Sequence, residues 1–268
     1  MRLGHIVYSN CFPVHARLLD RPASGDPEIV SGIPSRLNLL LERGEIDLAP
    51  CSSIEFARHA DRYSVLPDLV IGSRGPVRSI LLLASRRPEH LQGARVAVPT
   101  ASATSVVLLK ILLRLRWGVE CTFAWFDQSR DDPFAAGADA ALFIGDVALG
   151  ADLHPDRPVR IDLGTEWWEH TGLPFAFAVW QSGGSGTEEM RRIHALLLES
   201  RDYGLAHREA LAERHAGRFG LPAPVLAQYW STLDFSLDGE MRAGLLEFYR
   251  QAREIGELTH APEIRWAV

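Results

Sequence analysis

Hydroxyl-bearing residues are concentrated in the segment Thr100-Ala-Ser-Ala-Thr-Ser105, where four of six positions carry a hydroxyl group. The segment lies between an expected strand, Arg95–Val98, and Val106–Trp117, which is apolar nearly all round as in a buried helix. Free N–H groups at a helix start, together with the helix dipole, bind anions, and hydroxyl groups add donors that suit a carboxylate. An ordinary helix cap, which one Ser or Thr provides, is the alternative. The candidate ligand-binding residues here are Ser102, Ala103, Thr104 and Ser105.

A second polar position follows the expected strand Ala138–Ile144, where Gly145 and Asp146 lead directly into a helix. The Asp146 carboxylate can accept a hydrogen bond from a substrate hydroxyl or act as a base. It can equally cap the helix through its own side chain, and the two roles are compatible. We expect Gly145 and Asp146 to face a ligand.

A third polar position, Ser9-Asn10, follows the first expected strand, Leu3–Tyr8. An asparagine amide donates and accepts hydrogen bonds but does not titrate, which suits Asn10 to orienting a hydroxyl rather than moving a proton. An ordinary turn role for Asn10 is the alternative. Further single hydroxyls stand at expected junctions between elements, at Ser52, Ser53 and Ser79.

Other chemical groups are scarce in this chain. Lys110 is the one lysine among 28 basic residues, so Schiff-base chemistry would depend on it alone. There is no phosphate-binding GxxxxGK[ST] loop and no HExxH pair, and Glu166 and His170 offer at most two metal ligands. Three cysteines form no CxxC pair. We therefore expect no metal and a site of neutral hydroxyl groups that positions a small carboxylated molecule.

Composition excludes several classes of protein. The net charge of −6 is the reverse of the basic surplus that a nucleic-acid partner requires. No stretch approaches the roughly 20 apolar residues of a membrane span. The first twenty residues lack the apolar core of a secretory signal, so a cytoplasmic location is expected.

Strand and helix signals alternate from Leu3 to Trp180, which predicts an α/β protein with parallel sheets covered on both faces. Four helices are expected after Gly186. Two apolar extended segments, Ser79–Ala84 and Phe175–Trp180, bracket a middle series and are expected to cross between lobes. We predict that residues 1–84 and 175–268 form one lobe with a helical C-terminal part, and that residues 85–174 form an inserted second lobe. Ligands of such proteins bind in the cleft between the sheets.

Several segments occur in one order along nearly the whole chain: Tyr8-Ser-Asn10 with Pro13, Pro34-Ser-Arg-Leu, Gly44-Glu-Ile-Asp-Leu-Ala49, Ser102-Ala-Thr-Ser105, Ile144-Gly-Asp146 and Asp162-Leu-Gly…Trp167…Thr171-Gly-Leu-Pro-Phe175. Together they resemble the chorismate dehydratase family of the futalosine route to menaquinone. The resemblance implies a periplasmic-binding-protein-like fold of type II, with two lobes that each hold a central sheet flanked by helices. It also implies a carbon–oxygen lyase, a hydro-lyase that converts chorismate to 3-[(1-carboxyvinyl)oxy]benzoate and water without a metal or organic cofactor.

Carried over by position, the resemblance implies catalytic roles for Asn10 and Asp146 beside the reacting ring. Ser79 and the 102–105 turn would receive the two carboxylates, and the enolpyruvyl carboxylate itself would take the proton. The remaining substrate-binding candidates are Ser9, Ser52, Ser53 and Gly145. At Ser9 and at Cys11-Phe12 the chain departs from the residues common in the family, which changes the expected pocket shape beside Asn10.

Two alternatives remain open at this stage. The sister enzyme of the same route makes 1,4-dihydroxy-6-naphthoate, but that family tends to open with Pro-Asn-Asp, and here no Asp follows Asn10. A non-catalytic binding protein for a small carboxylate would suit the same fold. Such receptors need an export signal or a lipid-anchoring cysteine, and Cys11 follows no apolar segment.

Overall fold

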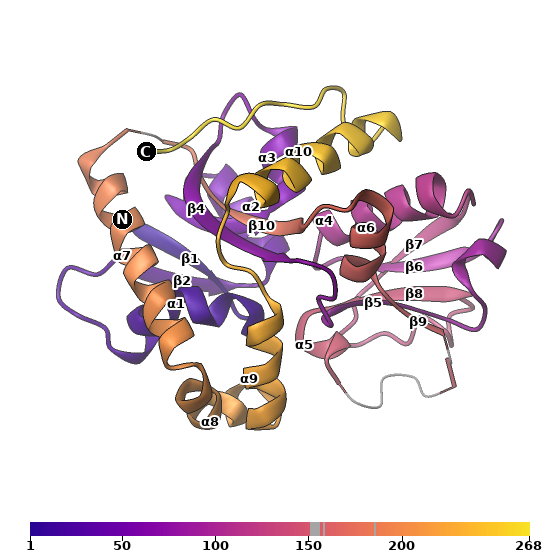
Figure 1. Cartoon of the computed structure of the whole chain (residues 1–268), viewed down its shortest axis with the longest axis horizontal. Helices are drawn as coiled ribbons and strands as arrows, with labels where there is room; N and C mark the ends of the chain where they lie inside the picture. Colours follow the sequence, from indigo (N-terminus) through magenta and orange to yellow (C-terminus); the bar gives the residue numbers. More distant parts are fainter. Residues whose placement is uncertain (151–155, 158, 185) are drawn as a thin grey trace.

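The computed structural model describes residues 1–150, 156–157, 159–184 and 186–268, which build two five-stranded sheets in two lobes (Figure 1). The first sheet has the order β2 (Glu28–Gly32), β1 (Arg2–Ile6), β3 (Leu48–Ser52), β10 (Phe175–Ser182) and β4 (Ser64–Ser73). The second has the order β7 (Thr122–Phe126), β6 (Arg95–Pro99), β8 (Ala140–Ile144), β5 (Ile80–Ala84) and β9 (Val159–Asp162). The expected α/β architecture of two lobes, each with a central sheet, is confirmed.

Both sheets are mixed, so the expectation of purely parallel sheets is wrong. In the first sheet β10 runs antiparallel to β3 and β4, and in the second β5 runs antiparallel to β8 and β9. The pairs β1–β2, β1–β3, β6–β7 and β6–β8 are parallel. The reason is that β5 and β10 are the first strands after the chain passes from one lobe to the other. A strand that enters a sheet from the cleft between the lobes runs away from the cleft. The other strands of the same sheet, which are parallel to one another, run toward the cleft.

Strand β5 corrects one part of the expected division into lobes. Residues 80–84 were expected in the first lobe, but all five residues of β5 pair with β8 in the second sheet. Within the sheet β5 has a hydrogen-bonded neighbour on each side, β8 and β9, so it is an interior strand, and interior strands are usually apolar. The remaining extents of the two lobes stay a prediction.

The helices divide between the lobes and cover the sheets. Around the first sheet lie α1 (Phe12–Asp20), α2 (Pro34–Glu42), α3 (Ser53–Arg58), α7 (Glu188–Ala206), α8 (Arg208–Phe219), α9 (Ala223–Thr232) and α10 (Gly239–Glu254). With the second sheet lie α4 (Thr104–Ile111), continued by a π-helical turn over Leu112–Arg116, α5 (Gly145–Ala148) and α6 (Leu163–Thr171). Helix α10 packs on β10 and α3 of the first lobe and on α4 of the second, so it spans the lobe boundary.

No helix in the described part of the chain is long and apolar enough to cross a membrane. The cytoplasmic location remains a prediction, which cell fractionation would test.

A buried histidine pair joins β1 to α1 in the core of the first lobe. Trp180 Nε1 donates to His15 Nε2 at 3.2 Å, so the neutral His15 ring carries its proton on Nδ1 and donates it to His5 Nδ1 at 3.0 Å. Cys11 Sγ lies 3.9 Å from the same His15 Nδ1. These three side chains are close enough together to hold a metal ion. Because Trp180 donates to His15 Nε2, however, His15 Nδ1 carries a proton and has no lone pair for a metal ion. Hydrogen bonds therefore explain why these three side chains lie together.

This pair predicts a loss of stability in acid. Burial lowers the pKa of His5 to about 3, with Arg218 adding to the shift, and burial lowers the pKa of His15 well below its ordinary value. The unfolded chain binds these protons near the ordinary pKa of about 6.5, so the free energy of unfolding falls as the pH drops from that value toward 3. At pH 4 the His5 contribution to this loss is roughly 3 kcal/mol.

Urea unfolding of the wild type between pH 7 and pH 4 should show this slope. The variant His5→Gln should show a shallower slope, and the same change at the exposed His260 should leave the slope as it is. An equally steep fall in His5→Gln would contradict the assignment.

Candidate active site

The carboxyl ends of the parallel strands meet in one cavity between the lobes. Asn10 follows β1, Ser52 ends β3, Ser102 follows β6 and Gly145 follows β8, and all four line this cavity. Ser79 lines it as well, because β5 starts at the cleft and runs away from it. Tyr8 and Ser105 also line the cavity, and the other lining residues are apolar: Ile6, Pro34, Ile71, Ile80, Ile144, Phe177 and Ala178. None of the described residues that line the cavity is charged.

Asn10 lies in a single 3-10 turn, Ser9–Cys11, between β1 and α1. Its Oδ1 atom is buried and has no hydrogen-bond partner among the described residues. A buried acceptor without a partner is costly, by about 1–3 kcal/mol, so such atoms are rare away from functional sites. The atom is therefore placed to accept a hydrogen bond from a ligand hydroxyl.

Ser79 is held by a tyrosine from the C-terminal helices. Tyr229 on α9 donates its hydroxyl proton to Ser79 Oγ at 2.7 Å, and burial raises the Tyr229 pKa, which keeps the phenol protonated. Because Ser79 Oγ accepts this hydrogen bond, its own proton remains free to be donated into the cavity.

The variant Tyr229→Phe should therefore weaken substrate binding. Loss of one hydrogen bond of about 1 kcal/mol corresponds to a roughly 5-fold rise in KM with a smaller change in kcat. Tyr249→Phe is the matched control, because that buried hydroxyl donates to Ser53 O at 2.9 Å and does not reach a residue that lines the cavity. Steady-state kinetics of both variants check the prediction, and equal KM values would contradict it.

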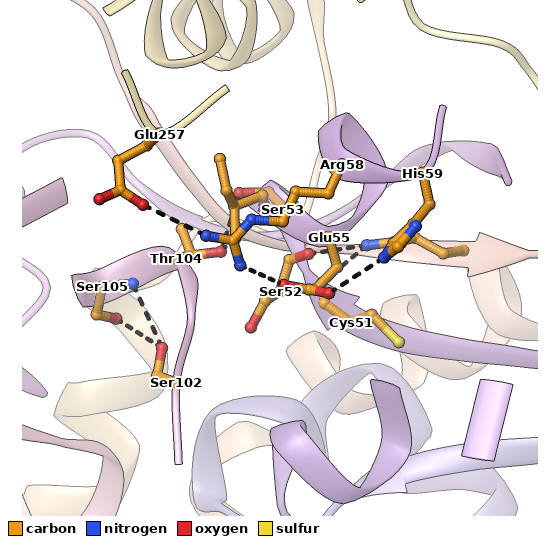
Figure 2. Close-up of polar contacts among 12 residues, drawn as sticks. Cys51, Ser52, Ser53, Glu55, Arg58, His59, Ser102, Thr104, Ser105 and Glu257 are labelled. Atoms are coloured by element: carbon orange, nitrogen blue, oxygen red, sulfur yellow. Dashed lines mark hydrogen bonds and ion pairs between the residues drawn. The ribbon is translucent and has the colours of Figure 1, made fainter. Parts of the chain in front are cut away.

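The residues of the 102–105 turn face two different parts of the molecule. Ser102 Oγ donates to Ser105 Oγ at 3.0 Å, and both residues line the cavity (Figure 2). Thr104 instead faces the first lobe, where its Oγ1 accepts from Ile54 N at 3.2 Å and lies 3.3 Å from Ser53 Oγ. The contacts of Thr104 join the lobes.

Two more of the sequence candidates lie outside the cavity wall. Ser53 is fully buried and donates to Ala176 O at 2.8 Å, so its hydroxyl is occupied within the first lobe. Ala103 lines a neighbouring pocket rather than this cavity. Ser53, Ala103 and Thr104 therefore do not line the cavity, contrary to expectation, and the same holds for the candidates Ser9 and Asp146.

The carboxylate of Asp146 accepts hydrogen bonds from a residue of the first lobe, Ser9. Both of its carboxylate oxygens accept from Ser9 N at 3.1 Å, and Ser9 Oγ donates a further short hydrogen bond to it. Burial raises the Asp146 pKa, and the hydrogen bonds from Ser9 oppose this shift. Gly145 has a φ of 62°, and a Cβ there would lie 3.1 Å from the Tyr8 ring, so only glycine fits without strain.

Comparison with known proteins gives this site its context. Residues 1–254 match a family model described as menaquinone biosynthesis. Over 271 aligned residues the chain is 32% identical to a chorismate dehydratase from Thermus thermophilus, covering 92% of this chain and 93% of that protein. The chain belongs to the chorismate dehydratase family. A second family member, the chorismate dehydratase of Campylobacter jejuni, is 34% identical over 182 residues, covering 66% of each protein.

Solved structures confirm the periplasmic-binding-protein-like fold. A protein of Archaeoglobus fulgidus matches with a TM-score of 0.76 at 18% identity, covering 96% of this chain and 98% of that one. The periplasmic aliphatic sulphonate binding protein of Escherichia coli matches with a TM-score of 0.67 at 19% identity, covering 100% of this chain and 91% of that one. At these identities the likeness shows the fold alone.

This member of the chorismate dehydratase family has a second, larger pocket beside the cavity, of about 270 Å³. It is lined by residues of both lobes and shares Ser102 with the cavity. Glu55 on α3 lies at this pocket and pairs with Arg58 at 2.8 Å and with His59 at 3.8 Å (Figure 2). This group was not predicted from the sequence, because one acidic and two basic residues spaced about one helical turn apart usually form a solvent-exposed helix face.

Sequence reasoning also missed three aromatic residues that support the site. Tyr8 lines the cavity and packs on Gly145, while Tyr229 and Trp230 reach it from α9. Tyr8 stood in a motif that the analysis quoted, so its position was a usable signal. Tyr229 and Trp230 could not be recognised in this way, because the sequence of an apolar helix far along the chain does not show which strand the helix covers.

Proposed function

We propose that this chain is a chorismate dehydratase, a hydro-lyase that converts chorismate to 3-[(1-carboxyvinyl)oxy]benzoate and water in the futalosine route to menaquinone. Membership of the family supports the proposal. The observation that carries it is the cavity between the lobes, which several serines line together with Asn10, whose buried Oδ1 has no hydrogen-bond partner among the described residues.

The reaction needs little more than orientation of the substrate. The C4–O bond of the ring breaks, a proton leaves C3, and the electron pair of that C–H bond completes an aromatic ring. Water is the only other product, so no oxidant or reductant takes part. Aromatisation supplies much of the driving force, and the protein contributes by positioning the groups that react.

In this proposal Asn10 binds the departing hydroxyl. Its unpartnered Oδ1 accepts a hydrogen bond from that hydroxyl, and its NH₂ group can donate to the oxygen as negative charge develops there. Ser79, Ser102 and Ser105 receive the carboxylates, together with main-chain N–H groups at the start of α4. No arginine or lysine is among the described residues that line the cavity, so these hydrogen-bond donors would have to compensate for the desolvation of both carboxylates.

The enolpyruvyl carboxylate of the substrate is the proposed acceptor of the C3 proton, and it passes this proton to the departing hydroxide, which leaves as water. Among the described residues that line the cavity, Tyr8 is the one with a titratable side chain. Burial, with the Asp146 charge adding to it, raises the Tyr8 pKa, so the phenol is protonated at neutral pH and is a poor base. The carboxylate of Asp146 is already bound to Ser9.

The lobes must separate to admit this substrate. The cavity measures about 40 Å³, which suits a few water molecules rather than a ring with two carboxylate groups. Closure around the bound substrate then excludes water and brings residues of both lobes onto it.

Incubation of the purified protein with chorismate, followed by mass detection of products, tests the proposal. The expected product is lighter than chorismate by one water. Binding without conversion would favour a carboxylate-binding protein, and conversion of cyclic dehypoxanthinyl futalosine in place of chorismate would favour the sister enzyme. Either result would reject the proposed activity.

A further inference from the structure

The carboxylate of Asp146 joins the second lobe to the turn that carries Asn10. Asp146 lies on α5 of the second lobe, and its two oxygens both accept from Ser9 N, at 3.1 Å each. On the other side of the same residue, Trp230 Nε1 of α9 donates to Ser9 O at 2.8 Å. The N–H and the C=O of Ser9 are therefore held from two different lobes, and Asn10 is the next residue along the chain.

Local packing allows this approach. The Tyr8 ring lies against the backbone of Gly145, where a Cβ would come within 3.1 Å of the ring. Because Gly145 has no side chain, α5 reaches the Ser9–Cys11 turn closely enough for a direct hydrogen bond. Gly145 N also donates to Ser79 O at 2.8 Å, so α5 is fixed to the start of β5 as well.

The same geometry argues against Asp146 as the base of the reaction. Asp146 is not among the residues that line the cavity, whereas its neighbours Gly145 and Asn10 are. Both carboxylate oxygens already accept hydrogen bonds from Ser9. A base must reach the proton it removes, directly or through one water, and Asp146 instead faces the main-chain N–H and the hydroxyl of Ser9.

We propose that Asp146 is a positioning residue, which captures the Ser9 peptide when the lobes close and so sets the orientation of Asn10. The inference rests on the proposed function, because it assigns Asp146 an effect on the reaction that Asn10 carries. Misplacement of a reacting group by about 1 Å can lower a rate about 100-fold, so one bridging carboxylate can have a large effect without touching the substrate.

Three single variants separate positioning from other roles. Asp146→Ala removes the bridge and should lower kcat by about 100-fold with KM changed less than about 3-fold. Asp146→Asn keeps one acceptor oxygen for Ser9 N and should remain within about 10-fold of the wild type. Asp139→Ala is the matched control, because Asp139 also accepts from a main-chain N–H, Arg95 N at 2.9 Å, but within the second lobe. That control should leave kcat unchanged.

The decisive measurement combines Asp146→Ala with Asn10→Ala. If Asp146 acts through Asn10, the double variant should be about as slow as Asn10→Ala alone, because residues that act as a unit are not additive. A multiplicative loss in the double variant would overturn the proposal, as would an Asp146→Asn variant as slow as Asp146→Ala. A fall in thermal stability with kcat unchanged would reduce Asp146 to a structural residue and would also overturn it.

Small-angle X-ray scattering without substrate keeps this test separate from the proposed function. Loss of the bridge in Asp146→Ala should increase the radius of gyration relative to the wild type and to Asp139→Ala, whatever the reaction catalysed. An unchanged radius together with unchanged kcat would reject the bridge while the proposed function stands. A wild type that fails to convert chorismate would reject the proposed function, and the scattering would still decide the bridge.

Discussion

Replacement of Asn10 by alanine should lower kcat for chorismate by about 10²–10³-fold, the range seen when a single hydrogen-bonding group that faces developing charge is removed. The reason is that Asn10 lines the cavity between the lobes with a buried Oδ1 that has no partner among the described residues, so this atom can orient the hydroxyl while the NH₂ group donates to the oxygen where charge develops. KM should change by less than about 10-fold, since an interaction that strengthens in the transition state affects kcat more than ground-state binding.

Asn10→Asp sharpens this prediction. The side chain keeps its shape but loses the NH₂ donor and gains a negative charge in a cavity whose described lining is uncharged and whose substrate is an anion. Turnover should fall at least as far as in Asn10→Ala, and substrate binding should weaken. The exposed Ser236→Ala is the control. Full turnover by Asn10→Ala, measured by product formation, would show that Asn10 does not contact the reacting hydroxyl.

Replacement of Gly244 by alanine should reduce the free energy of unfolding by roughly 3 kcal/mol, at the upper end of the cost of overpacking a core. Gly244 lies on α10 and faces Pro174, the residue before β10, and an added Cβ would meet the Pro174 carbonyl oxygen at 1.9 Å. A backbone carbonyl group cannot rotate away as a flexible side chain can, so the helix α10 itself must move to relieve the clash. The helix propensity of alanine returns at most about 1 kcal/mol.

Gly239→Ala on the same helix is the matched control, because an added Cβ there has no neighbour within 4 Å. That variant should be as stable as the wild type or slightly more stable. Urea denaturation of the two variants measures the difference. If they unfolded at the same urea concentration, the close packing of α10 on the start of β10 would be disproved.

The position of Gly244 matters for function as well as for stability. Helix α10 contacts β10 and α3 in the first lobe and α4 in the second, so it lies across the boundary that closure must deform. A displaced α10 would change the relative placement of the lobes. The activity of Gly244→Ala should therefore fall at temperatures where the variant is still folded.

Much of the architecture could be predicted from residue patterns. Four helices were expected after Gly186, and α7, α8, α9 and α10 occupy that part of the chain. Apolar segments predicted strands near the right places. The candidate residues that follow strands, Asn10, Ser102 and Gly145, meet in one cavity because the carboxyl ends of parallel strands share one edge of a sheet. Ordered motifs along the chain indicated the family, and the comparisons confirmed it.

Strand direction and side-chain direction were decided only by the tertiary structure. A sequence pattern marks a strand but not whether it runs toward or away from the cleft, so the antiparallel β5 and β10 were missed. Thr104 faces the first lobe while its neighbour Ser105 lines the cavity, because successive residues on a helix point about 100° apart.

Long-range partners explain the remaining differences. Asp146 was expected beside the substrate, but its carboxylate instead accepts a hydrogen bond from the N–H of Ser9, 137 positions earlier in the chain. Tyr229 holds Ser79 from 150 positions away. Residue types and local spacing therefore determine which groups are brought to the cleft, since they set the strands and their ends. Which of those groups remain free for a ligand depends on contacts between distant segments, and only the folded chain settles those.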